Sequence, residues 1–177
     1  MLTTHDIARL LVPVTAAYGE RFQHLGDVTV AAWRHFIGHL PYRVAELAID
    51  RAIRRSPYPP TPHDVLREAA ELLLPEDARL SPAEAWGLVL AEVRRTGVYG
   101  RPNLPGLVGR AVDIVGWREI CTSEHVDVVR AQFCRVFEQL VQRTRDELAL
   151  ARALPPWAAE RAAELTGARY PALEEVR

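Results

Sequence analysis

The sequence has 177 residues, of which 49% are hydrophobic and 25% charged, so it can form a packed core and is not of the disordered class. Its formal net charge of −1 gives the molecule no general attraction to nucleic acid. All 22 basic residues are arginine, which excludes chemistry that needs a lysine. No apolar run approaches the roughly 20 residues of a membrane helix. The polar start at Met1 to Asp6 lacks the pattern of a secretory signal, so we expect a cytoplasmic protein without membrane contact.

Two amphipathic helices are predicted before residue 41. The first begins after Thr3 and ends near Gly19, because threonine caps helix starts and glycine ends helices. The second begins at Asp27 and closes at Leu40, ahead of a proline. The expected inward residues recur every three or four positions and are Ile7, Leu10, Leu11, Val14 and Ala17 in the first helix, and Val30, Trp33, Phe36 and Ile37 in the second.

A proline-rich connector separates the third and fourth predicted helices. The third starts at Pro41 and ends at Arg54 and Arg55, whose charges suit the C-terminal end of a helix dipole. Residues 56–60 cannot be helical, because their prolines remove hydrogen-bond donors and favour extended backbone. The fourth helix then starts after Thr61 and runs to Leu74.

The pattern is interrupted at residues 74–79 and starts again with a new signal. Ser81 followed by Glu84 is a capping box, and the helix that it opens ends at Gly97. An ordered loop is expected over residues 98–105. The remaining helices are predicted at residues 107–115 and 117–121, from 123 or 127 onwards, and weakly at 157–165, with a frayed tail at 171–177. The core face of the long helix that starts at 123 or 127 includes Val126 and fades beyond Arg143.

These patterns predict an all-α fold with two small helical lobes and no β-sheet. The first lobe is expected at residues 1–75 and the second at residues 81–153. A weakly helical C-terminal tail is expected at residues 154–177.

Nucleotide and metal sites find little support in the sequence. A phosphate-binding P-loop ends in a lysine, and none is present. Gly106 and Gly109 follow no strand, so we interpret them as allowing close helix packing rather than as a dinucleotide turn. His35 and His39 share one helix face at a spacing that can hold a metal, but they lack an evident third ligand. We therefore expect neither a cofactor nor a metal.

Cysteine chemistry is the remaining route to catalysis. Cys121 lies four residues before His125, which could bring a thiol and an imidazole together, and Cys134 is the second candidate nucleophile. Both cysteines lie in apolar helical surroundings, and we interpret them as free core thiols. No catalytic residue is assigned, and we expect the protein to act by binding.

One polar cluster is a candidate partner-binding site. Its members are Arg94, Arg95, Tyr99, Arg101, Trp117 and Arg118. Arginine and aromatic side chains dominate protein-binding hot spots, and they also hold single-stranded nucleic acid. The structural alternative gives Arg94 and Arg95 a place at a helix C-terminus and Trp117 a place in the core. All three interpretations remain open at this stage.

The first half of the sequence resembles the N-terminal domain of phage replicative helicase loader/inhibitor proteins over residues 3–74. The resemblance is carried by Trp33 with Phe36, Leu40-Pro41-Tyr42, Val44, Ala48, Ile53, the connector with Thr61-Pro62, and Val65. It implies a small helical bundle. It also implies an ATP-independent adaptor that binds the replicative helicase hexamer, restrains it, and delivers it to an origin-bound initiator protein.

The second half resembles uncharacterised prophage replication-module proteins. This likeness rests on Ala85-Trp86, Val93, Arg95, Gly97, Tyr99, Ala111-Val112, residues 116–121, Ser123-Glu124, Arg130-Ala131 and Phe133. Loaders of the family have a flexible C-terminal part that engages the helicase, whereas residues 81–145 are predicted to be folded. The alternative function is a DNA-binding replication or packaging accessory protein, with weak DNA contact through the arginine cluster.

Overall fold

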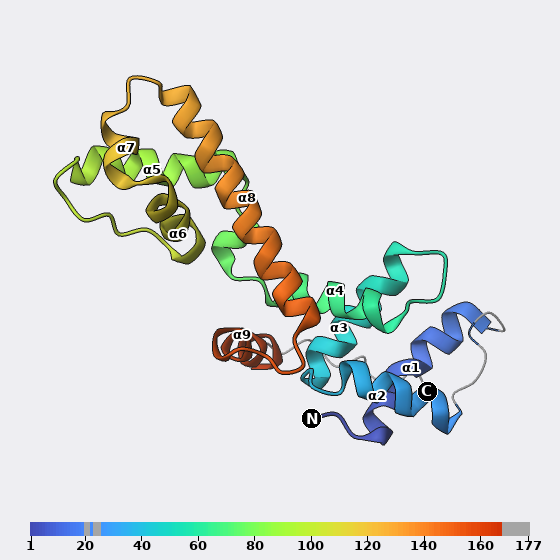
Figure 1. Cartoon of the computed structure of the whole chain (residues 1–177). Coiled ribbons are helices and arrows are strands. Elements are labelled where there is room, and N and C mark those ends of the chain that lie inside the picture. Colours follow the sequence, from blue (N-terminus) through green and yellow to red (C-terminus); the bar gives the residue numbers. More distant parts are fainter. Residues whose placement is uncertain (20–21, 23–25, 168–177) are drawn as a thin grey trace. The chain divides into compact units, whose positions relative to one another are not determined.

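The computed structural model describes residues 1–19, 22 and 26–167 (Figure 1). Its regular elements are helices, and these residues contain no strand, which confirms the predicted all-α class. None of the described helices has the length and apolarity needed to cross a membrane. The chain forms two compact units, one of residues 74–146 and one of residues 1–73 together with the segment that begins at Glu147. The tail predicted at residues 171–177 lies outside the described residues.

The described part of the first unit contains five complete helices, each close to its predicted position, and the end of a helix shared with the second unit. They are α1 (Thr4–Tyr18), α2 (Asp27–Ile37), α3 (Tyr42–Arg55), α4 (Pro62–Leu73) and α9 (Pro156–Gly167). The capping box of α1 is formed by Thr3 and Asp6: the Asp6 amide donates to the Thr3 hydroxyl at 3.1 Å, and the Thr3 amide donates to the Asp6 carboxylate at 2.8 Å. Thr61 and Asp64 form the same reciprocal pair at the start of α4.

The core of the first unit comes from the apolar stripes of α1 to α4. Its fully buried side chains are Ile7, Leu11, Val14, Ile37, Val44, Val65 and Leu73. Two residues that we expected to face inward do not: Ala17 is exposed, and Phe36 remains 50% exposed. Because Val30, Trp33 and Ile37 already form the buried stripe of α2, Phe36 lies at its edge.

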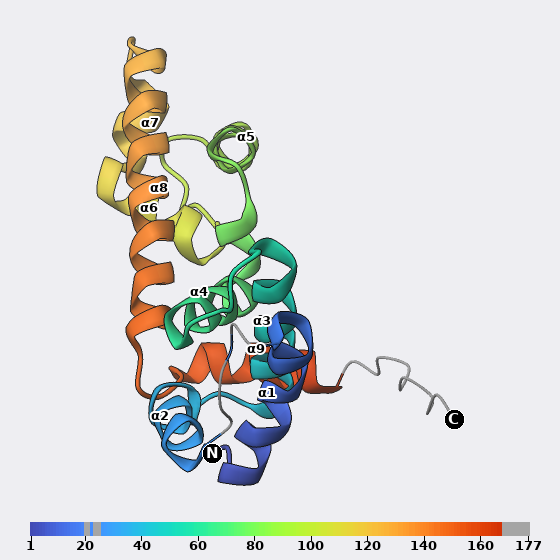
Figure 2. The same ribbon diagram turned by 90° about the vertical axis from the view of Figure 1, so that its right-hand side faces the viewer.

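Helix α9 is part of the first unit, not a tail. It packs against α3 and α4, and Figure 2 shows it lying beside α3. Its small residues Ala158 and Ala162 are 0% and 2% exposed, so they allow the helix backbones to approach closely. The unit is therefore built from two separate stretches of sequence, whereas we had assigned residues 147–153 to the second lobe and residues 154–177 to a tail.

The proline-rich connector between α3 and α4 is held by a side chain from α1. The Tyr18 hydroxyl lies 2.7 Å from the carbonyl oxygen of Ser56, to which it donates. Ser56 ends α3 in extended backbone, as the prolines that follow it require. The connector thus has a fixed point at its first residue.

Replacing Tyr18 with phenylalanine should lower the free energy of unfolding by about 1 kcal/mol, because one intramolecular hydrogen bond is lost while the ring stays. Tyr58→Phe is the matched control, since Tyr58 is 70% exposed and removing its hydroxyl should change little. Urea unfolding followed by circular dichroism measures both variants. Equal effects of the two substitutions would contradict the anchoring role of Tyr18.

The second unit contains the short 3-10 helix η2 and the helices that follow it. These are η2 (Glu76–Arg79), α5 (Pro82–Thr96), α6 (Gly106–Val115), α7 (Trp117–Thr122) and most of α8 (Val126–Leu150). The predicted capping box is present, with the Glu84 amide 3.2 Å from the Ser81 hydroxyl. The core is centred on Phe133, whose ring centroid lies 5.3 Å from that of Trp86 and 6.1 Å from that of Phe137.

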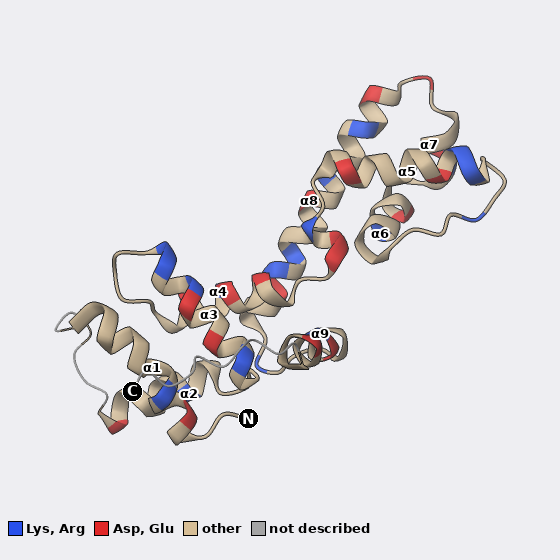
Figure 3. Cartoon of the chain, turned by 180° about the vertical axis from the view of Figure 1, so that it is seen from behind, with Lys and Arg blue, Asp and Glu red and all other residues tan. Residues whose placement is uncertain are grey.

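The core face of helix α8 extends further towards the C-terminus than predicted. We expected its core face to fade after Arg143, but Thr144 and Leu148 continue the buried series and the helix ends at Leu150. At the other end Val126, expected in the core, is 53% exposed. Both basic and acidic residues are spread along α8 (Figure 3), so the charge of this helix is mixed.

Candidate partner-binding surface

The predicted cluster is built around the loop that joins α5 to α6 in the second unit. Helix α5 ends at Gly97, whose φ of 67° lies in a region that favours glycine. Residues 98–105 follow as the loop, and α6 ends at Gly116, whose φ of 100° again favours glycine. Helix α7 starts immediately afterwards with Trp117, so Gly116 alone joins α6 to α7.

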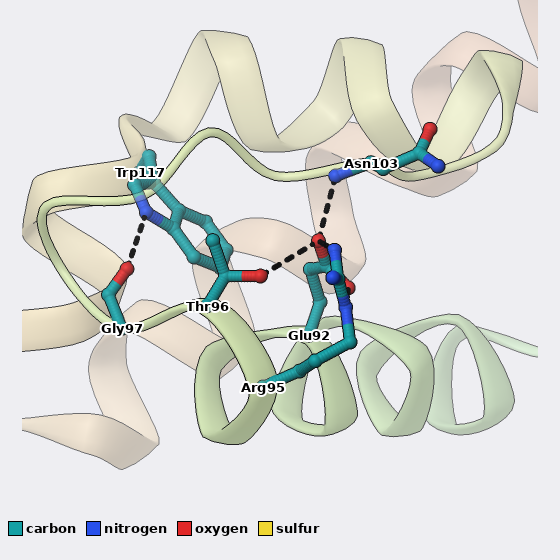
Figure 4. Close-up of polar contacts among 6 residues, drawn as sticks. All are labelled: Glu92, Arg95, Thr96, Gly97, Asn103 and Trp117. Atoms are coloured by element: carbon teal, nitrogen blue, oxygen red, sulfur yellow. Dashed lines mark hydrogen bonds and ion pairs between the residues drawn. The ribbon is translucent and has the colours of Figure 1, made fainter.

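Glu92 on α5 is the polar centre of this region (Figure 4). Its side chain is only 8% exposed. The carboxylate accepts hydrogen bonds from the Arg95 guanidinium at 2.6 and 2.9 Å, from the Thr96 hydroxyl at 3.1 Å, and from the Asn103 amide at 2.7 Å. The bond to Asn103 joins the helix to the loop, so this carboxylate fixes the loop against α5.

The ionised form of Glu92 is strongly favoured by these contacts. The hydrogen bond from Arg95, and then that from the Asn103 backbone, lower the pKa of Glu92 from 4.5 to about 2. Because the folded pKa lies below the unfolded one, the stabilisation is complete above about pH 4.5 and is lost as the pH falls towards 2.

Glu92→Gln should therefore lower the free energy of unfolding at neutral pH. The difference in this free energy between the variant and the unmodified protein should become smaller as the pH falls from 4.5 towards 2. The capping carboxylates Asp6, Asp64 and Glu84 also have lowered pKa values and lose stabilisation in acid, but they are common to both proteins. The thermal unfolding midpoints of the variant and the unmodified protein at several pH values measure this difference in stability. A deficit that did not change with pH would contradict this role of the Glu92 charge.

Trp117 anchors the N-terminal end of the loop. Its indole Nε1–H donates to the Gly97 carbonyl oxygen at 3.2 Å, across from the end of α5 to the start of α7 (Figure 4). The side chain is half-buried. Trp117 and Arg95 thus have internal partners. Arg95 lies in the last turn of α5, as the structural interpretation expects, whereas Trp117 is not the core residue that it expects.

Five of the six predicted residues are exposed. One of them is Arg95, whose side chain is 63% exposed although it is paired with Glu92. Arg94, Arg101 and Arg118 are exposed, and Tyr99 is fully exposed. None of these four side chains makes a hydrogen bond or ion pair to another described residue. Because Tyr99 and Arg101 lie on a loop fixed at Gly97 and Asn103, they are presented without the entropy cost of ordering a long free loop.

The sequence analysis did not single out Glu92, although a signal was present. Trp86 and Val89 form a buried series at a spacing of three residues, and Glu92 is the next member of that series. A carboxylate on a core face needs partners, and Arg95 one turn later is a suitable one. The bond to Asn103 could not be predicted, since it depends on the path of the loop.

The other candidate sites are not assembled. His35 is exposed and His39 half-buried, and no group of three or more potential metal ligands occurs in the part of the chain that the structure describes. Cys121 and Cys134 are both free and half-buried, not core residues as expected. Burial raises the pKa of the Cys121 thiol, which disfavours the reactive thiolate.

Gly106 and Gly109 lie in the first half of α6, and a side chain would be crowded at Gly109 but not at Gly106. A Cβ atom at Gly109 would lie 3.2 Å from the Leu104 carbonyl oxygen. The first turn of α6 is also bonded to η2, because the Leu107 amide donates to the Asp77 carboxylate. Both observations agree with close packing as the role of these glycines.

Residues 2–66 match the family model for the N-terminal domain of the phage helicase loader/inhibitor family. This stretch contains α1 to α3 and the first turn of α4, all within the first unit. The match confirms the resemblance of this part to phage helicase loader/inhibitor proteins, whereas the likeness of the second half to prophage replication-module proteins stays a prediction. No curated protein and no solved structure matches the chain.

Proposed function

We propose that this protein is an ATP-independent adaptor that binds the replicative DNA helicase hexamer and loads or restrains it during phage or prophage DNA replication. The observation that supports the proposal most directly is the match of residues 2–66 to the N-terminal domain of the loader/inhibitor family. In this role the protein works in the cytoplasm, through contacts with the helicase and with an initiator protein, and catalyses no reaction.

The composition of the chain is consistent with an adaptor that hydrolyses no ATP. A P-loop ATPase needs a lysine to reach the β and γ phosphates, and this sequence contains none. Energy for remodelling the helicase would then come from binding alone, as differential affinity for two helicase states.

The helicase contact that we propose is the exposed part of the α5–α6 region, formed by Arg94, Tyr99, Arg101 and Arg118. These residues are of the types that dominate binding hot spots. Arginine forks bind carboxylates in bidentate geometry, so an acidic surface on the helicase is the expected counterpart. Arg95 and Trp117 would support this surface through their hydrogen bonds to Glu92 and Gly97.

The test is size-exclusion chromatography with light scattering of the full-length protein mixed with the replicative helicase of its phage or host, with and without ATP. The proposal expects a co-eluting complex of defined stoichiometry. Arg101→Glu with Arg118→Glu should abolish it, and Tyr99→Ala should weaken it by about tenfold, or ~1.4 kcal/mol.

Arg130→Glu is the matched control, because Arg130 is an exposed arginine of the same unit on α8. A complex that survived the double charge reversal would move the contact elsewhere on the protein. Absence of any complex in either nucleotide state would refute the helicase proposal.

One observation favours the alternative, a DNA-binding replication or packaging accessory protein. Tyr99 is a fully exposed aromatic ring with Arg101 two residues away, a pair that can stack a base and bind a phosphate. Single-strand binding of this kind would weaken steeply with added salt, because counterions are released from the phosphates. Fluorescence anisotropy of a labelled oligonucleotide at increasing salt distinguishes the two functions.

A further inference from the structure

The first unit has a groove of about 600 Å³ far from the α5–α6 surface in sequence. Its walls come from the residues around the start of α1, the C-terminal half of α2, and residues 149–152 at the end of α8. Leu2 and Leu66 contribute apolar surface within it, and they are buried and half-buried, respectively. Phe36 and Leu150 also line it and remain 50% and 80% exposed.

The exposed apolar side chains at this groove require an explanation. Isolated exposed apolar residues are common on protein surfaces, but here two large ones line the same concavity. The Phe36 ring makes an edge-to-face contact with the neighbouring His35, whose centroid is 5.1 Å away at an interplanar angle of 83°. The rest of the Phe36 ring is apolar surface that binding would cover.

The charge of the groove is of one sign. Arg34 and Arg152 line it, and no aspartate or glutamate does. Neither arginine side chain has a hydrogen bond or an ion pair to any other described residue. This sets them apart from arginines such as Arg55 and Arg161, whose guanidinium groups lie 2.7 Å from Glu68 and Glu164.

The histidines of the groove do not offset this charge. Burial lowers the pKa of His39, so its imidazole is neutral at physiological pH, and its hydrogen bond to the Phe36 backbone opposes that shift only in part. The acidic residue of the first turn of α1, Asp6, is occupied by its capping bonds to Thr3. The surface therefore combines apolar contacts with two guanidinium groups that lack carboxylate partners among the described residues.

We propose that this groove binds an acidic, amphipathic peptide segment of a partner protein. Apolar side chains of the segment would cover Phe36 and Leu150, while its carboxylates would pair with Arg34 and Arg152 in bidentate geometry. An amphipathic helix placed in a groove is a recurrent mode of peptide recognition. The inference does not depend on the helicase being the partner, because it uses only the first unit.

Nucleic acid fits this groove less well than a peptide. Bases bind by stacking on aromatic or guanidinium planes, which Phe36, Arg34 and Arg152 offer, but Leu2, Leu66 and Leu150 add aliphatic surface that base stacking does not use. Burying aliphatic groups is favourable for apolar side chains of a peptide, at roughly 25 cal/mol per Å². A peptide with both apolar and acidic residues can cover the aliphatic side chains of the groove and also pair with its two arginines.

The experiment selects displayed random peptides of about 16 residues, long enough for an amphipathic helix, on the full-length protein. Peptides that also bind the Arg34→Glu, Arg152→Glu double variant are removed. We expect the remaining peptides to be rich in aspartate and glutamate, with leucine or phenylalanine at helical spacing. Fluorescence anisotropy should show that the double variant binds them at least about tenfold more weakly, or ~1.4 kcal/mol.

Phe36→Ala tests the apolar half of the proposal without changing charge, and it should also weaken binding. Arg130→Glu in the second unit should leave peptide affinity unchanged, and circular dichroism shows that each variant is folded. Three results would overturn the inference: no enriched peptide, enriched peptides without an acidic bias, or a peptide affinity that neither the double variant nor Phe36→Ala changes. A dimer that the double variant abolishes, or an oligonucleotide that requires the two arginines, would assign the groove to a second copy or to nucleic acid instead.

Discussion

Phe133→Ala is expected to lower the free energy of unfolding of the second unit by about 3–5 kcal/mol. The side chain is fully buried, and its ring lies between those of Trp86 and Phe137. Truncation removes the apolar surface of the ring and leaves a cavity between two aromatic residues that cannot collapse onto each other easily. A helical unit of this size has only a few kcal/mol of stability, so the loss is close to the whole of it.

The effect should be confined to the second unit. Hydrogen exchange followed by mass spectrometry should show lost protection in α5 and α8, with α3 and α4 much less affected. Gln132→Ala is the control, because the neighbouring side chain is exposed on the same helix. A loss below about 1 kcal/mol, or an equal loss of protection in both units, would contradict the packing described here.

Helix starts are the part of the fold that the sequence predicts well. The capping boxes of Thr3 with Asp6 and Ser81 with Glu84 lie within four consecutive residues, so their hydrogen bonds require no knowledge of distant segments. The positive φ at Gly97 and Gly116 is likewise a local property of a helix end. Local chemistry fixes these positions, and the structure confirms them.

Contacts between distant segments are the part that the sequence could not predict. Arg95 was a candidate for partner binding, but a carboxylate on its own helix holds it, and that carboxylate is buried only because the loop at Asn103 covers it. Arg34 and Arg152 meet at one groove although more than a hundred residues separate them in sequence. Neither arrangement leaves a periodic signal, because each depends on how helices pack.

The packing of α9 on α3 and α4 could not be predicted from the sequence for the same reason. The helix is short and its inward residues are alanines, so its apolar stripe is weak and the sequence indicated only a weakly helical tail rather than a part of the first unit. In the structure Ala158 and Ala162 are nearly inaccessible to solvent, because α9 packs on α3 and α4. Small residues produce a close contact here without producing a strong hydrophobic pattern.

Ala162→Glu should destabilise the first unit by about 3 kcal/mol, since a longer side chain ending in a carboxylate would enter a close helix contact. Ala163→Glu is the matched control: it makes the same chemical change one residue later on the same helix, at an exposed position. Its expected effect is within about 0.5 kcal/mol. Urea unfolding of both variants, followed by circular dichroism, gives the difference. Equal stabilities would mean that α9 does not pack against α3 and α4, and that the first unit is completed by residues 1–73 alone.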